Sequence, residues 1–183
     1  MPARSKRLIY LTGFMGSGKT TIAPILANTL GYSHIDIDEE IEKTTGTRIS
    51  EIFAHAGEKV FRDIERKLLT AASTADECVV SLGGGTIAND ENISIVKSSG
   101  LLVYLKAEVD EIVKRLRHKT NRPLIISEDG TPLPEEVLRE RVRSMLALRE
   151  PYYSQADIVV MTGNRRVGLT IDDIVRRVTR FTF

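Results

Sequence analysis

A glycine-rich loop near the amino terminus constrains the fold of this chain more than any other feature. Residues 13–20 read GFMGSGKT and match the pattern G-x-x-x-x-G-K-[ST] at every fixed position. An apolar run, Leu8–Thr12, predicts a buried strand before the loop, and Lys19–Leu30 predicts a helix after it. Glycines in such a unit let backbone N–H groups surround an anion at the positive end of the helix dipole. The sequence therefore predicts a nucleoside-triphosphate site.

Short apolar runs alternate with helical patterns along the rest of the chain. The predicted strands are Leu8–Thr12, His34–Asp36, Val79–Leu82, Leu101–Leu105 and Ile158–Met161. The further predicted helices are Glu58–Ala72, Val109–Lys119, Pro134–Glu150 and Ile171–Phe181. Nearly continuous apolar strands indicate a parallel sheet covered on both faces, so we expect an α/β fold with right-handed crossovers. The proline-rich loop Arg122–Pro134 is a candidate for a mobile lid.

Composition narrows the class of protein. The 183 residues, 42% of them hydrophobic, are enough for one packed domain and contain no run near the roughly 18 apolar residues of a membrane span. A net charge of +1 and an aromatic content of 5% disfavour a nucleic-acid partner, because that binding depends on positive charge and stacking. The lone Cys78 cannot form an internal disulfide or a structural zinc site. We expect a soluble, cytoplasmic monomer without a membrane partner.

The end of the glycine loop carries the residues for phosphate chemistry. Lys19 is expected to bridge the β- and γ-phosphates of a nucleotide, and the Thr20 hydroxyl to coordinate Mg²⁺. A turn that only starts a helix is the alternative, and the complete motif in its strand–helix context disfavours it. Pro24 lies inside the predicted helix and cannot donate to the Thr20 carbonyl, so we expect a kink or a solvated carbonyl there.

Two aspartates follow the second predicted strand. Asp36 and Asp38 are two residues apart, so on an extended strand both would face the same side. Two carboxylates there suit two tasks, one in the shell of Mg²⁺ and one on an acceptor hydroxyl. The alternative is an acidic helix N-terminus, which explains Glu39, Glu40 and Glu42 well and the two aspartates only in part.

Three consecutive glycines, Gly83–Gly85, follow the third predicted strand. They leave backbone open at the carboxyl edge of the sheet, where α/β proteins bind their ligands. A small substrate can lie against these N–H groups, although a tight turn would explain the glycines equally well. Ser81 stands where other P-loop proteins often have an acidic residue.

Seven motifs in this order resemble the shikimate kinase family over nearly the whole chain. They are the loop 13–20, Asp36-Ile-Asp38, Phe61-Arg62 with Glu65, Gly83-Gly84-Gly85, Arg122-Pro123-Leu124, Arg149-Glu-Pro-Tyr-Tyr153 and Asn164-Arg165-Arg166. Their order and spacing are specific, whereas each of the later motifs alone is weak. The resemblance implies one domain over residues 1–183 with a three-layer α/β/α P-loop kinase fold. It also implies a five-stranded parallel sheet, a helical substrate-binding region at about 36–65 and a lid at about 117–134.

The resemblance further implies transfer of the γ-phosphate of ATP, with Mg²⁺, to the 3-hydroxyl of shikimate on the way to chorismate and aromatic amino acids. The implied nucleotide-binding residues are Gly16, Ser17, Gly18, Lys19, Thr20, Thr21, Arg115, Arg122, Arg165 and Arg166. The implied shikimate-binding residues are Asp38, Arg62, Gly83, Gly84, Gly85 and Arg149. Thr20 and Asp36 would serve the metal, and Lys19, Asp38 and Arg122 would be catalytic.

Two of these arginines suit an anionic acceptor. A guanidinium grips a carboxylate through two parallel hydrogen bonds, which a lysine cannot do. For Arg62 the alternative is a surface ion pair with Glu58 one helical turn away. Arg149 lies near the end of a predicted helix, where a cation is favourable in any case.

Three other functions remain as alternatives. A gluconate or nucleoside monophosphate kinase would share the fold, but a nucleotide acceptor calls for a second base pocket rather than two arginines. A GTPase switch would need a guanine-specific motif of the Asn-Lys-x-Asp kind, which the sequence lacks. A nucleic-acid-dependent ATPase is disfavoured by the near-neutral charge.

Overall fold

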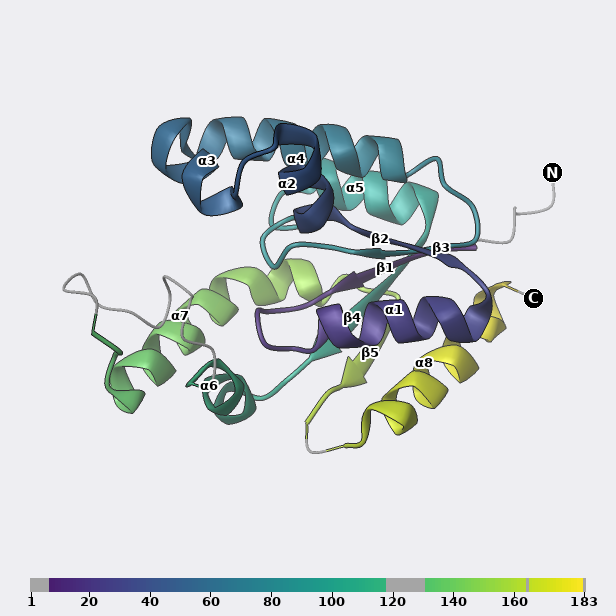
Figure 1. Ribbon diagram of the computed structural model, residues 1–183. Coiled ribbons are helices and arrows are strands. Elements are labelled where there is room, and N and C mark those ends of the chain that lie inside the picture. The colour runs from purple at the N-terminus through teal and green to yellow at the C-terminus, as the bar shows by residue number, and fades with distance from the viewer. Residues whose placement is uncertain (1–6, 118–130, 164, 183) are drawn as a thin grey trace.

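The structure, a computed structural model, describes residues 7–117, 131–163 and 165–182, and its centre is one five-stranded sheet (Figure 1). The strands are β1 (Leu8–Thr12), β2 (Ser33–Asp36), β3 (Cys78–Ser81), β4 (Leu101–Lys106) and β5 (Ile158–Met161). They lie in the order β2-β3-β1-β4-β5, and every neighbouring pair is parallel. The predicted α/β class with a five-stranded parallel sheet is confirmed.

Helices cover both faces of this sheet and make the fold three-layered (Figure 1). The helices are α1 (Lys19–Leu30), α2 (Ile37–Thr45), α3 (Ile49–His55), α4 (Gly57–Ala72), α5 (Asp90–Ser99), α6 (Val109–Arg117), α7 (Glu135–Tyr153) and α8 (Val167–Thr182). Helices α1 and α8 contact each other on one face. Apolar residues of α2 to α7 pack into a second core on the opposite face.

Side chains of the central strand β1 alternate between the two cores. Ile9 and Leu11 are fully buried with Leu26 of α1 and Ile174 of α8. Tyr10 between them is fully buried in the other core. Burial of each such side chain contributes about 1.5–3 kcal/mol, which is why both faces of a central strand must be apolar.

The predicted strands and the longer predicted helices agree with the structure, although the ends of several differ by a few residues. Leu8–Thr12 and Ile158–Met161 are strands with the predicted bounds. Helix α7 continues to Tyr153, beyond the predicted end at Glu150, and passes through Pro151. A proline near the carboxyl end of a helix removes only one backbone hydrogen bond, so the last turn persists.

Helices α3 and α5 were not predicted from the sequence, and α2 was considered only as the alternative, an acidic helix N-terminus, which the structure confirms. They have between seven and ten residues and bury three residues or fewer each, so their periodic signal is weak. Side-chain caps mark the starts of two of them, Asp36 for α2 and Asn89 for α5. Helix α1 is one helix through Pro24.

The topology brings the candidate motifs to one edge of the sheet. The glycine loop follows β1, Asp36 ends β2, and the three glycines follow β3. Parallel strands place all their carboxyl ends on the same edge. Most of the predicted lid lies outside the described residues. Within the described residues, no helix combines the length and the apolar composition that crossing a bilayer requires.

Candidate active site

A cavity of about 690 Å³ lies at the carboxyl edge of the sheet and gathers most of the predicted site residues. Those that line it are Gly16, Ser17, Gly18, Lys19, Thr20, Thr21, Asp36, Asp38, Arg62, Gly83, Gly84, Gly85, Arg115, Arg149 and Arg165. Arg166 does not line the cavity, and Arg122 lies outside the described residues. This volume lies within the range of about 300–1,000 Å³ that small-molecule sites span.

The glycine loop is held in a shape that needs glycine. Gly13 has φ +148°, and a Cβ there would lie 2.5 Å from the Leu105 carbonyl oxygen and 2.7 Å from Ser17 Oγ. Gly18 has φ +103° and caps the start of α1 in the left-handed region. The Lys19 ammonium donates to the Gly13 carbonyl at 2.6 Å, so its charge lies over the loop. The loop is therefore shaped for an anion.

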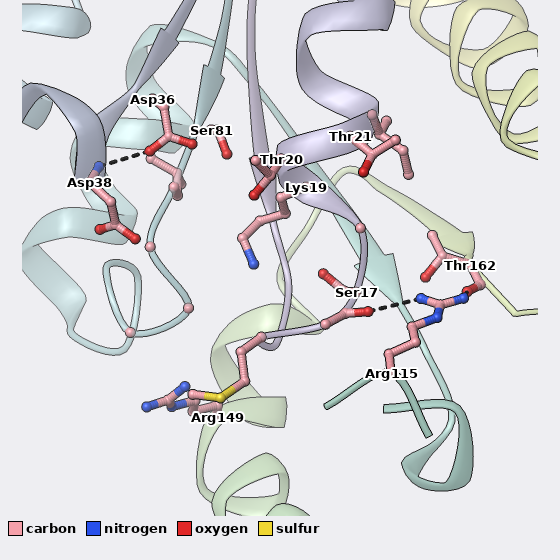
Figure 2. A pocket seen from close by; sticks show the side chains of 18 of the residues that line it. Ser17, Lys19, Thr20, Thr21, Asp36, Asp38, Ser81, Arg115, Arg149 and Thr162 are labelled. Atoms are coloured by element: carbon pink, nitrogen blue, oxygen red, sulfur yellow. Dashed lines mark hydrogen bonds between the residues drawn. The ribbon is translucent and has the colours of Figure 1, made fainter. Parts of the chain in front are cut away.

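Asp36 and Asp38 reach the cavity by a different route from the one predicted. Asp38 is in the first turn of α2 and not on an extended strand, so the alternation argument is wrong for this pair. Asp36 ends β2 and caps α2, its Oδ1 accepting from the Asp38 N–H at 2.9 Å and the Glu39 N–H at 3.3 Å. That cap turns the chain so that both carboxylates line the cavity. Figure 2 shows them on one side of Lys19, with Arg115 on the other.

Arg62 of α4 is held between two acids. Its guanidinium donates to Glu65 at 2.9 Å and to Glu58 at 3.2 and 3.3 Å, so the pair with Glu58 is present but is only part of its environment. Burial alone would lower the pKa of Arg62, but hydrogen bonds to Glu65 and Glu58 outweigh it and raise that pKa. A Cβ on Gly85 would lie 3.0 Å from Arg62 Nη2, so the cation faces the glycine run.

Arg149 of α7 approaches the glycine run from another element. Its guanidinium lies 5.4 Å from the centre of the Phe14 ring, a cation–π contact, and Nη1 would be 3.3 Å from a Cβ on Gly84. The Tyr153 hydroxyl donates to the Gly84 carbonyl. Burial raises the pKa of Tyr153 to about 12, so this donor keeps its proton throughout the neutral range. Two guanidinium groups from separate helices therefore flank one backbone run.

The end of α7 is anchored to the sheet by contacts that the sequence did not indicate. Glu150 accepts from the Tyr104 hydroxyl at 2.8 Å and from the Lys106 ammonium at 2.6 Å. The rings of Tyr104 and Tyr153 stack with their centres 4.9 Å apart. These contacts join residues more than 40 positions apart. They could be found only once the packing of α7 on β4 was known.

Arg115 of α6 connects two loops at one end of the cavity. It donates to the Gly16 carbonyl at 2.9 Å, to the Gly163 carbonyl at 3.0 Å and to the Thr162 carbonyl. Figure 2 shows Arg115 beside Thr162. The first carbonyl belongs to the glycine loop and the others follow β5. Arg115 thus fixes the width of this end of the cavity.

The fold and this cavity define a P-loop kinase. The glycine loop, which is shaped to bind an anion, lines one part of the cavity, and the carboxylates of Asp36 and Asp38 also line it. The guanidinium groups of Arg62 and Arg149 face the glycine run 83–85. A phosphate donor and a small anionic acceptor can therefore meet in one cleft.

Comparisons with known proteins identify the family. The family model described as "Shikimate kinase" matches residues 15–180. The shikimate kinase of Chlorobium phaeobacteroides is 46% identical over 174 residues, which cover 95% of this chain and 92% of that one. Among solved structures, shikimate kinase from Acinetobacter baumannii in complex with shikimate gives a TM-score of 0.84 at 32% identity, covering 94% of this chain and 93% of that one.

Shikimate kinase from Bacteroides thetaiotaomicron gives a TM-score of 0.85 at 28% identity, covering 94% of this chain and 98% of that one. The chain belongs to the shikimate kinase family and is therefore a kinase.

Proposed function

We propose that this chain transfers the γ-phosphate of ATP to the 3-hydroxyl of shikimate, with Mg²⁺ as cofactor. The observation that carries the proposal is the convergence of Arg62 and Arg149 on Gly84 and Gly85, in the same cavity as the glycine loop. Shikimate is a small ring with one carboxylate and three hydroxyls. Its carboxylate suits the two guanidinium groups, and its flat ring suits a backbone surface without side chains.

At the nucleotide end, the chain offers N–H groups of the glycine loop, Lys19 and Thr20 to the phosphates of ATP. Lys19 lies over the loop, 2.6 Å from the Gly13 carbonyl, and would exchange that contact for phosphate oxygens. Thr21, Arg115 and Arg165 line the outer end of the cavity, where the nucleoside would lie.

The residues beside Thr20 fit a magnesium ion held mainly by phosphates. Strand pairing places Asp36 opposite Ser81, and both line the cavity with Thr20 (Figure 2). The helix cap uses Oδ1 of Asp36. In the described part of the chain, no three His, Cys, Asp or Glu side chains gather into a metal site. The hydroxyls of Thr20 and Ser81 and the carboxylate of Asp36 form a small set of oxygen donors. Such a set suits Mg²⁺, which keeps several waters and uses few protein ligands in kinases. When bound, the ion would neutralise charge on the transferred phosphate.

We assign Asp38 to the acceptor hydroxyl. Its Oδ1 would lie 2.9 Å from a Cβ on Gly83, at the start of the glycine run that we assign to shikimate. A carboxylate at this position would orient the hydroxyl toward the γ-phosphate. It would accept the hydroxyl proton as the new O–P bond forms and the bond from the γ-phosphorus to the bridging oxygen breaks, with ADP as the leaving group. Arg122, outside the described residues, would add positive charge to the phosphate. On the family likeness, we assign the substrate region to 36–65 and the lid to 117–134 of one domain.

Beyond the site, we propose that the chain acts as a cytoplasmic monomer without nucleic-acid or membrane partners. Its net charge of +1 supports the first of these two exclusions.

A coupled ADP-release assay tests the proposed function, with shikimate, gluconate and nucleoside monophosphates as acceptors side by side. We expect turnover with shikimate only, dependent on ATP and Mg²⁺. Faster ADP release with gluconate or a nucleoside monophosphate would overturn the assignment. ADP release without any acceptor would indicate an ATPase instead.

A further inference from the structure

A set of buried polar contacts lies next to the three glycines and includes Glu65, which also lines the cavity. Its members are Glu65 of α4, Thr86 after the glycines, and Asn92 of α5, and none is more than 1% exposed. Buried polar groups must be hydrogen-bonded to be stable, and a buried carboxylate most of all. Their contacts therefore decide where Glu65 can point.

Each oxygen of the Glu65 carboxylate has one donor among these contacts. Thr86 Oγ1 donates to Oε1 at 2.6 Å, and Arg62 Nη1 donates to Oε2 at 2.9 Å. Asn92 Nδ2 in turn donates to the Thr86 carbonyl at 2.7 Å, and the Thr86 N–H donates to the Gly83 carbonyl at 3.1 Å. The backbone of Thr86 is thus held on both sides, and its branched side chain has few rotamers. Its hydroxyl is a fixed donor.

Arg62 has a competing partner that would draw it away from the cavity. Glu58 also accepts from Arg62, and the Glu58 side chain is 68% exposed whereas that of Glu65 is 1% exposed. Of these two acids, Glu65 is the one that draws the guanidinium inward. If Glu65 loses its fixed orientation, the balance moves toward Glu58 and solvent.

The carboxylate of Asp38 lies near that of Glu65, so the orientation of Glu65 also affects Asp38. The position of a Cβ on Gly83 lies 2.9 Å from Asp38 Oδ1, 3.0 Å from Thr86 Oγ1 and 3.4 Å from Glu65 Oε1. Two carboxylates therefore lie close to one point, and like charges at this separation repel. The Thr86 hydroxyl holds one of them in place.

We propose that Thr86 is a positioning residue of the acceptor site. Its hydroxyl fixes Glu65, and Glu65 aims Arg62 across Gly85 toward the carboxylate of the acceptor. The inference rests on the proposed function, because it assumes that Arg62 binds the acceptor's carboxylate. It adds a residue that touches neither ligand.

Steady-state kinetics of Thr86→Val test the inference, because valine keeps the shape and removes the hydroxyl. We expect the KM for shikimate to rise about ten-fold, as loss of one hydrogen bond to a charged group implies, with kcat and the KM for ATP changed less than about three-fold. Thr86→Ser should restore the wild-type KM. Thr12→Val is the matched control: Thr12 is fully buried, and its hydroxyl has no hydrogen-bond partner in the described part of the chain.

A double-mutant cycle with Arg62→Ala separates positioning from general damage. Where Arg62 is absent, Thr86→Val should change kcat/KM for shikimate by less than about two-fold, because the two residues act as one unit. An unchanged KM in Thr86→Val, an equal rise in both KM values, or additive losses would each overturn the inference. If Thr86→Val does not fold, Thr86→Ala removes the same hydroxyl and is read in the same way. A wild-type chain inactive on shikimate would refute the proposed function rather than this role of Thr86.

Discussion

Replacing Arg62 by alanine should damage substrate binding and stability by separable routes. The guanidinium that we assign to the acceptor's carboxylate also neutralises Glu65, whose carboxylate is 1% exposed. Arg62→Ala therefore removes a ligand contact and leaves a buried charge without its cation. The loss of substrate binding and the loss of stability can be measured separately, because a second substitution should restore the stability and not the binding.

The size of each loss follows from the exposure of Arg62. Hydrogen bonds to charged groups contribute about 1.5–3 kcal/mol, and the 31% exposure of the Arg62 side chain lets water screen part of this. We expect about 2 kcal/mol of lost binding, or about a 30-fold fall in kcat/KM for shikimate. Breaking a fully buried ion pair costs about 3–5 kcal/mol, so with partial exposure we expect a fall of about 2 kcal/mol in the free energy of unfolding.

Two companion variants separate the routes. Glu65→Gln in the Arg62→Ala background removes the orphaned charge, so stability should recover while the loss in kcat/KM remains. Arg48→Ala is the matched surface control, because Arg48 forms an i,i+3 pair with Glu51 at 2.6 Å but does not line the cavity. It should leave both quantities at their wild-type values. The assays are ADP release at varied shikimate and urea unfolding.

The kinetic result can refute the reasoning directly. A kcat/KM for shikimate within three-fold of wild type in Arg62→Ala would remove this arginine from the acceptor site. An equal rise in the KM for ATP would show a general disturbance of the cavity instead. A double variant that regains activity would show that the charge of Glu65, not the loss of a ligand contact, limits turnover.

Three other perturbations test separate parts of the structure. Asp38→Asn should lower kcat by about 100-fold or more while ADP binding by calorimetry is kept, and an unchanged kcat would exclude Asp38 as base or orienting group. Gly84→Ala places a Cβ 3.3 Å from Arg149 Nη1, so the KM for shikimate should rise several-fold and the KM for ATP should not. Hydrogen bonds from Arg176 foremost lower the pKa of Asp173. A carboxylate with a lowered folded-state pKa stabilises the fold above its unfolded-state pKa of about 3.9, so Asp173→Asn should be less stable than wild type at pH 7. The difference should shrink as the pH falls below that value toward the lowered pKa of Asp173.

A control for Gly84→Ala comes from the same chain. Gly168→Ala adds a methyl group in α8 at a position with no neighbouring atom within 4 Å, so both KM values should stay at wild type. If Gly84→Ala behaves in the same way, Arg149 does not depend on that close approach. A stability difference for Asp173→Asn that persists unchanged at low pH would assign its effect to packing rather than to charge.

The fold was largely predictable because its signals are local. A strand, a glycine loop and a helix start are each encoded within a few residues, and a strand buried on both faces must read as continuous apolar sequence. The five strands and the glycine loop needed no knowledge of distant contacts. The two helices that were missed, α3 and α5, are short and bury three residues or fewer, so their pattern does not exceed that of a loop. The start of α2 was recognised only as an alternative, from its acidic first turn.

The sequence by itself determined which residue types are available to the site and, through the strand order of a parallel α/β chain, that they meet at one edge of the sheet. Only the tertiary structure decided how each is aimed. Asp38 faces the cavity because Asp36 caps the helix that begins there. Arg62 faces it because Thr86 holds Glu65. The glycine run is held at the cavity by the hydrogen bond from Tyr153 to the Gly84 carbonyl. The last two depend on contacts between positions 21 and 69 residues apart. Hydrogen bonds between such distant positions cannot be predicted from hydrophobic periodicity, because a local sequence pattern does not indicate which two side chains meet in the fold.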